Sequence, residues 1–279
     1  MLKKIYLIVY TFNKQLQRDN IGAYASSIAF FFLLSMIPTL SIAGFILMYS
    51  PMTEDEFINI LTVYSPDFLN VFIDDFVPQA YEYSATILPI AIITLLWSAG
   101  KGMWGLMMGL NTANEVKENR NALWVRIIAS FYSIVMIVIL IACMGMIILG
   151  ENVVNRLTEL FPYFSDFLQL LGNFRFIMVW GFLTLVFMFI YTLVPNKKMK
   201  MRFQIPGAVF TAIGWSLVSW GFSIYFNYFA GRASLYGSLT TIIVTMIWLY
   251  VIIYIMLIGA NLNRYFKSVI EPKMTKKDS

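Results

Sequence analysis

The sequence predicts an all-α protein that crosses a membrane six times. Of its 279 residues, 59% are apolar and only 13% are charged, whereas an ordinary globular domain carries about a quarter charged residues. Apolar runs of about 20 residues, the length that a helix needs to cross the hydrocarbon core of a bilayer, recur along the whole chain. We therefore expect one membrane domain over residues 1–270 and a polar cytoplasmic tail over residues 271–279.

The apolar runs define the expected transmembrane helices. The second run is the weakest, because Pro89 and the sequence Gly100-Lys101-Gly102 interrupt it. A cleaved signal peptide is not expected, since the first run is too long and lacks a small-residue cleavage site. The six predicted spans cover residues 27–48, 85–104, 127–149, 176–194, 205–228 and 237–262.

Amphipathic segments flank the first span. Residues 2–18 mix aromatic and aliphatic residues with Lys and Arg, a composition typical of an interfacial helix that lies along the membrane. Two interpretations are open. The helix acts as a gate or an anchor, or, more simply, it only positions the first span in the membrane. In the loop before the second span, EDEFINILTVY and PDFLNVFIDDFVPQAY have apolar residues at near-helical spacing. They predict two short helices on the outer side.

Charge is distributed unequally between the two sides of this topology. The N-terminal arm, the 101–126 connection, the 195–204 connection and the C-terminal tail hold 17 of the 20 Lys and Arg residues and only five of the 15 acidic residues. Cytoplasmic loops of membrane proteins carry such an excess of Lys and Arg. We therefore expect both termini in the cytoplasm, contact of the basic side with anionic lipid, and no nucleic-acid partner.

The residue types needed for most catalytic chemistry are scarce. Histidine is absent, and Cys143 is the single cysteine, so the commonest general base and any CxxC pair are missing. The sequence has no P-loop, no Gly-x-Ser-x-Gly elbow, no HExxH and no Rossmann glycine pattern. We expect no enzymatic activity, no metal and no cofactor.

Four stretches resemble one family. They are DNIGAYASSIAFFFLLSMIP in the first span, LNTANEVKENR ending at Arg120, YTLVPNKKMKMRFQIPGAVF, and SLYGSLTTIIVTMIWLYVIIYIMLIGANLN with Tyr236, Trp248 and Gly259. Together they are similar to the YihY/BrkB family of bacterial inner-membrane proteins, formerly mislabelled as ribonuclease BN. The resemblance implies a six-helix fold in the bacterial plasma membrane and a link to envelope integrity or to the export of lipids or small molecules. The family usually has Glu where this chain has Asn261, which puts a proton or cation role of that position in doubt.

The leading functional hypothesis is a transporter or exporter of unknown substrate, in which polar faces of the first, fifth and sixth spans line a path. Buried polar groups are costly in a bilayer and are therefore candidates for function. The expected path or gate residues are Ser26, Ser27, Asn111, Arg120, Tyr236 and Asn261. The expected helix-shaping residues are Pro38, Pro195, Gly207, Gly237 and Gly259.

Two other classes compete with transport. A structural or envelope-assembly protein would use the same polar residues only to hold its helices together, and a homo-oligomer fits either class. A nuclease is the weakest alternative, because phosphodiester hydrolysis usually needs a metal held by clustered carboxylates or histidines.

Overall fold

The computed structural model describes residues 2–47, 53–64, 69–136, 138, 175–197, 199–229 and 238–274. Within these ranges every regular element is helical, which confirms the all-α prediction for this part of the chain. The elements are α1 (Leu2–Arg18), α2 (Ile21–Leu47), α3 (Glu54–Tyr64), α4 (Asn70–Ala113), a helix over Ala122–Met136, α7 (Arg175–Leu193), the short η3 (Met201–Phe203), α8 (Ile205–Phe229) and α9 (Ser238–Met274).

Four of these helices are long and apolar enough to cross a membrane. The candidate spans are Ile21–Ile42, Leu88–Ala113, Ile205–Tyr225 and Leu239–Lys267. The helix over Ala122–Met136 and the segment Trp180–Leu193 of α7 are apolar but shorter. Most of the predicted third span lies outside the described residues, so the count of six remains a prediction.

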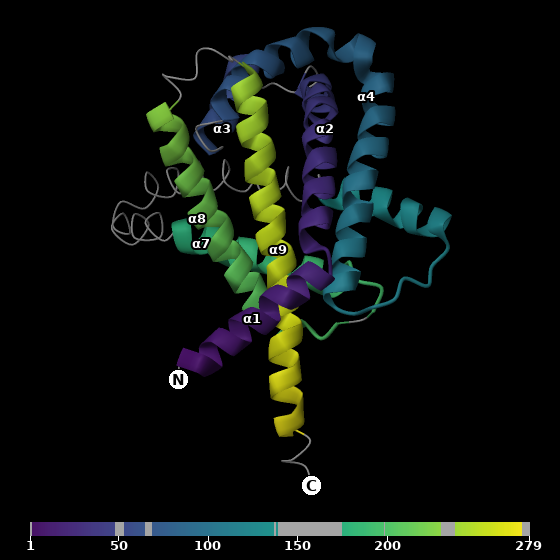
Figure 1. Ribbon diagram of the computed structural model, residues 1–279. Helices are drawn as coiled ribbons and strands as arrows, with labels where there is room; N and C mark the ends of the chain where they lie inside the picture. The colour runs from purple at the N-terminus through teal and green to yellow at the C-terminus, as the bar shows by residue number, and fades with distance from the viewer. Residues whose placement is uncertain are drawn as a thin grey trace, which may run out of the picture.

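The predicted interruption of the second span is wrong. α4 runs as one helix of 44 residues through Pro78, Pro89 and Gly100-Lys101-Gly102. Its N-terminal part, which was expected as a separate outer helix, lies across one end of the molecule before α4 turns to run beside α2 (Figure 1). Lys101 therefore lies inside an apolar helix and does not belong to the basic connection with which it was counted.

The segment between α2 and α4 contains a helix that its own sequence caps. Thr53 Oγ1 accepts a hydrogen bond from the Glu56 backbone N–H, and a Glu56 carboxylate oxygen accepts one from the Thr53 N–H at 2.8 Å. This reciprocal pair is a capping box, which satisfies backbone donors that the first turn of a helix leaves free. It explains why α3 begins at Glu54.

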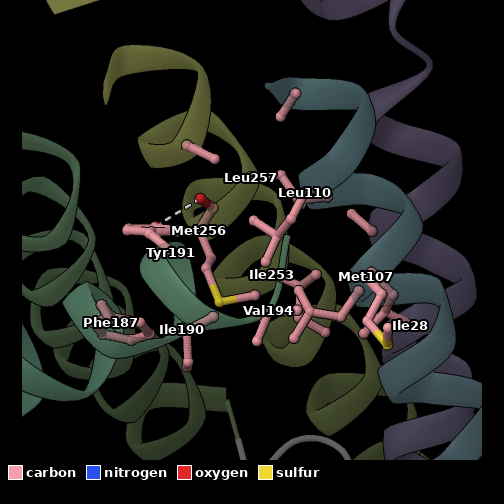
Figure 2. Close-up of a cluster of buried hydrophobic side chains, with 14 of the residues drawn as sticks. Ile28, Met107, Leu110, Phe187, Ile190, Tyr191, Val194, Ile253, Met256 and Leu257 are labelled. Carbon is pink, nitrogen blue, oxygen red and sulfur yellow. Dashed lines mark hydrogen bonds between the residues drawn. The ribbon is translucent and has the colours of Figure 1, made fainter. Parts of the chain in front are cut away.

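The core lies where α2, α4, α7 and α9 meet. Figure 2 shows Ile28 of α2 and Leu110 of α4 on one side of it and Ile190 of α7 on the other, with Ile253 and Leu257 of α9 between them. A second apolar cluster joins α4 to α9 through Val77 and Trp248. α9 is thus the helix around which the others pack.

The four segments expected on the cytoplasmic side lie at the same end of the structure. Hydrogen bonds and ion pairs join the end of α1, the segment after α4, the segment after α7 and the C-terminal half of α9. The acidic helix α3 lies at the other end (Figure 1). The separation of charge that the sequence predicts is therefore present along the long axis of the helices.

Candidate functional site

A cluster of charged and amide side chains occupies the end of the bundle where α1, α2, α4 and α9 meet. We call Arg18, Asp19, Glu115, Asn261 and Arg264 the charged end cluster. Its members come from three separate parts of the chain, and each forms a hydrogen bond or an ion pair with another member. Figure 1 shows why: α1 crosses α9 at this end, and the C-terminus of α4 approaches the same point.

Asp19 is the buried carboxylate of the cluster, with 7% of its surface exposed. It lies in the turn between α1 and α2, where Asn20 has a positive φ of 49°, a conformation that Asn tolerates well. Arg18 Nε donates to Asp19 Oδ1 at 3.0 Å, and Arg264 Nη2 lies 3.5 Å from Asp19 Oδ2. A buried carboxylate is costly unless cations compensate it, so Asp19 depends on these two arginines.

Glu115 joins the cluster from the segment after α4. Its carboxylate lies 3.0 Å from Arg18 Nη2 and 3.2 Å from Arg264 Nη1. Its φ of 54° falls in the left-handed region, which costs an L-residue other than Gly or Asn about 1 kcal/mol. Backbone hydrogen bonds from the Glu115 N–H to the Thr112 carbonyl at 3.0 Å and from the Val116 N–H to the Asn111 carbonyl at 2.8 Å define this turn, in which the chain leaves α4.

Asn261 is nearly fully buried and lies under the ion pairs. Its Oδ1 accepts from Arg264 Nη2 at 3.3 Å and from Gln15 Nε2 at 3.5 Å, and its Nδ2 donates to the Leu257 carbonyl at 3.0 Å. Asn261 therefore links α9 to α1. A carboxylate at this position would lose the donor to Leu257 and would place a second buried anion near Asp19.

Asn111 and Arg120 form a second group beside the first. Arg120 Nε and Nη2 each donate to the Glu118 carboxylate at 2.7 Å, and Asn111 Nδ2 donates to Glu118 Oε2 at 2.8 Å. Asn111 Oδ1 accepts the backbone N–H of Asn196 at 2.8 Å. Asn111 thereby ties the end of α4 to the loop after it and to the chain after α7.

The Arg120 guanidinium lowers the pKa of Glu118 below its ordinary value of 4.5, mainly through the hydrogen bonds between them. The same bonds raise the pKa of Arg120. A lowered carboxyl pKa stabilises the fold fully above pH 4.5, and this stabilisation is lost as the pH falls through the lowered pKa.

We expect Glu118→Gln to remove one component of the acid sensitivity of the protein. Because protonation removes the charge that Arg120 and Asn111 bind, the free energy of unfolding of the wild type should fall more than that of the variant as the pH falls below 4.5. The measurement is the free energy of unfolding in mixed detergent micelles across this range. Identical pH profiles would show that the Glu118 charge contributes nothing to stability.

A third group of polar side chains joins α8 to α9 at a close crossing. Asn263 Oδ1 accepts the backbone N–H of Gly207 at 2.6 Å, and Asn263 Nδ2 donates to Gln204 Oε1 at 3.1 Å. The first backbone N–H groups of a helix have no partner within it. Asn263 on α9 therefore caps the first turn of α8, and all three residues are buried.

Gly259 on α9 lies opposite Gly207, and Tyr191 of α7 closes the contact. The Tyr191 hydroxyl donates to the Met256 carbonyl at 2.7 Å, which is the bond drawn in Figure 2. Because its only hydrogen is used there, the Thr211 hydroxyl, also 2.7 Å away, donates to Tyr191. A Cβ at Gly259 would collide with the Thr211 and Tyr191 hydroxyl groups, and a Cβ at Gly207 would collide with the Gly259 carbonyl, so neither position has room for a side chain.

The remaining predicted site residues do not join these groups. Ser26 and Ser27 are exposed on α2, and the Ser26 hydroxyl donates to the Ala23 carbonyl of its own helix. Pro38 is buried within α2, which continues past it, and Pro195 is buried directly after α7. Tyr236 and Gly237 lie outside the described residues.

Several members of these groups were not predicted as site residues. Asp19, Glu115, Glu118 and Arg264 entered the sequence analysis only as charges. A usable signal was present, because acidic residues are scarce on the basic side and each one there has many cations to pair with. Within the described residues no group of three or more His, Cys, Asp or Glu side chains lies close enough to hold a metal ion.

The chain is similar to known membrane proteins over most of its length. It is 34% identical over 245 residues to the protein named "Putative ribonuclease-like protein YfkH" of Bacillus subtilis, covering 86% of this chain and 87% of that one. It is 26% identical to a UPF0761 membrane protein of Alteromonas mediterranea, covering 94% and 88% of the two chains. A UPF0761 membrane protein of Vibrio parahaemolyticus is 28% identical, with 90% and 79% covered.

No solved structure matches the chain. The family described as virulence factor BrkB matches residues 12–279, a range that includes the charged end cluster and the crossing of α8 and α9. This chain is therefore a membrane protein of the BrkB family.

Proposed function

We propose that this protein is a transporter of the bacterial plasma membrane that exports a lipid or another small molecule, and that it is not an enzyme. The observation that carries the proposal is the charged end cluster. Buried ionisable groups at the end of a membrane bundle are costly, and a purely apolar contact of the same shape often holds helices together as well or better.

The cluster has the properties of a gate. Its ion pairs join elements that are far apart in sequence, so α1 and the C-terminus of α4 can separate from α9 only when those pairs break. Glu115 and Arg18 are largely exposed, so water can replace their partners at little cost. Asp19 and Asn261 are buried and favour the closed state. This arrangement allows an open and a closed state that differ by a few kcal/mol in free energy. A substrate that binds one of them better shifts the populations toward that state.

The distribution of charge supports an orientation with both termini in the cytoplasm. With Lys101 assigned to α4, the four segments expected at this end still hold 16 of the 20 basic residues. Such an end faces the cytoplasm in most membrane proteins and attracts anionic lipids of the inner leaflet. We therefore propose anionic lipids as partners and no nucleic acid.

A structural or assembly protein is the second candidate. The observation that favours it is the crossing of α8 and α9, where the buried amide and hydroxyl groups of Asn263, Gln204, Tyr191 and Thr211 all have hydrogen-bond partners. Such contacts hold helices in one arrangement. The two candidates differ in whether the charged end cluster opens.

Reconstitution into vesicles tests the proposed export. Fluorescently labelled phosphatidylglycerol is placed in both leaflets, and a membrane-impermeant reductant removes the label from the outer leaflet. We expect vesicles that contain the protein to lose inner-leaflet label faster than protein-free vesicles, either without or with an imposed membrane potential. Loss at the protein-free rate under both conditions would contradict lipid export and favour the assembly candidate. Metal-dependent cleavage of RNA by the same preparation would contradict the proposal that it is not an enzyme.

A further inference from the structure

A cavity on the side of the bundle is separate from the charged end cluster. Its volume is about 320 Å³, and it lies between α2, α4 and the helix over Ala122–Met136. Lys101 of α4 and Arg126 of that helix both line it. Its other lining residues are apolar or glycine, among them Phe31, Trp104 and Leu123.

Lys101 is positioned by aromatic rings. Its ammonium group lies 4.5 Å from the centre of the Trp97 ring and 5.1 Å from that of Phe31. Such cation–π contacts compensate part of the hydration that a cation loses. Lys101 lies inside the candidate span Leu88–Ala113, where a charge without a role is costly.

Neither cation of the cavity forms an ion pair with a carboxylate in the described part of the chain. The first turn of the helix over Ala122–Met136 also borders the cavity through Ala122 and Leu123, and the N-terminus of a helix carries a partial positive charge. Gly100 lets this helix approach α4, since a Cβ there would lie 3.0 Å from Ser130 Oγ. The positive groups thus converge on one space that contains no anion of the described chain.

The mouth of the cavity is apolar. Leu123 and Trp104 are exposed at 74% and 48%. Trp97 and Trp104 lie one turn on either side of Lys101 along α4. A phosphate at Lys101 and Arg126 would therefore have its acyl chains beside Trp104 and Leu123.

We infer that this cavity binds the phosphate headgroup of an anionic phospholipid taken from the surrounding bilayer. The inference rests on the proposed export of lipids and names the ligand class. Lys101 and Arg126 contact the phosphate oxygens, while Phe31, Trp104 and Leu123 contact the glycerol and the first part of the chains. A free phosphate ion shares the headgroup chemistry but would gain nothing from the apolar mouth.

Native mass spectrometry of the full-length, delipidated protein tests this site. The probes are phosphatidylglycerol and phosphatidylcholine with the same acyl chains, each added at equal concentration. Because each basic residue near a membrane surface contributes substantially to anionic-lipid binding, we expect about a tenfold preference for phosphatidylglycerol. The double variant K101Q/R126Q should reduce this preference to about unity.

Matched variants distinguish binding at this cavity from a general attraction of anionic lipid to the basic residues of the protein. Lys200→Gln removes one exposed cation of the basic end outside the cavity and should keep the preference, as should K101R, which retains the charge. An unchanged preference in K101Q/R126Q, or an equal loss in Lys200→Gln, would overturn the inference. So would displacement of phosphatidylglycerol by millimolar inorganic phosphate, since the ligand would then be the free ion. The unfolding temperature of each variant shows that it remains folded.

The vesicle assay keeps this inference distinct from the proposed function. Selective binding by a wild-type protein that does not translocate lipid would leave the site standing and contradict export. Translocation that persists in K101Q/R126Q, after its binding preference is lost, would leave export standing and remove the cavity from the path.

Discussion

Gly207→Ala is expected to destabilise the protein by about 3 kcal/mol or more, the upper end of the cost of overpacking a core. A Cβ at this position would collide with the Gly259 carbonyl oxygen and would lie 2.6 Å from both polar atoms of the Asn263 amide. The carbonyl belongs to the backbone of α9 and cannot move without moving that helix. The variant must therefore separate α8 from α9 and break the hydrogen bond between Asn263 and the Gly207 N–H.

The control lies in the same helix. Gly221 of α8 has no described atom within 4 Å of an added Cβ, so Gly221→Ala should be neutral or should stabilise the helix by up to about 1 kcal/mol, the difference in helix propensity between the two residues. The measurement is the free energy of unfolding in mixed micelles, followed by tryptophan fluorescence. Equal effects at the two positions would show that the crossing is looser than the structure has it.

The sequence predicts helices well here because the apolar runs are long. The predicted interruption of α4 was wrong for a physical reason. Gly100, Gly102 and two prolines are helix breakers in water, but in α4 the glycines face neighbours: a Cβ at Gly102 would lie 2.6 Å from the Phe32 ring of α2. Close packing of α2 against α4 compensates for their low propensity, and single-residue propensities do not contain this contribution.

The candidate site was predictable only in part. Asn111, Arg120 and Asn261 are polar residues beside apolar runs, and the structure brings them to one end of the bundle. Their partners Glu118 and Arg264 are close to them in sequence, but the ion pairs of Arg264 with Asp19 and Glu115 join distant segments and depend on how the helices pack. Ser26 and Ser27 followed the same polar signal, but they are on the exposed face of α2, since one apolar run of uniform hydropathy does not indicate which face is buried.

Removing Arg264 is expected to cost about 3 kcal/mol, the typical penalty for breaking a buried ion pair. Arg264→Gln leaves the buried Asp19 with Arg18 alone and withdraws the guanidinium from Asn261. Asp19→Asn in the same chain removes the uncompensated charge and should restore part of the loss. The double-mutant cycle should therefore give a coupling energy of about 1–3 kcal/mol.

An exposed pair from the same cluster provides the comparison. Arg18 and Glu115 have side chains that are 64% and 61% exposed, so their cycle should give a clearly smaller coupling than that of Asp19 with Arg264. Equal coupling energies would mean that the burial of Asp19 does not strengthen its interaction with Arg264.

The same double variant distinguishes a gate from a structural contact. Asp19→Asn keeps the size of its side chain, Arg264→Gln shortens its side chain, and together they remove the charges that hold α9 against the turn between α1 and α2. If the cluster closes a path, the double variant should translocate labelled lipid in vesicles faster than the wild type, because the closed state has lost stability relative to the open one. If the cluster only holds helices together, the folded double variant should leave the translocation rate unchanged. An unchanged rate in a folded variant with a measurable coupling energy would assign the ion pairs to stability alone, and the proposed gate would then be wrong.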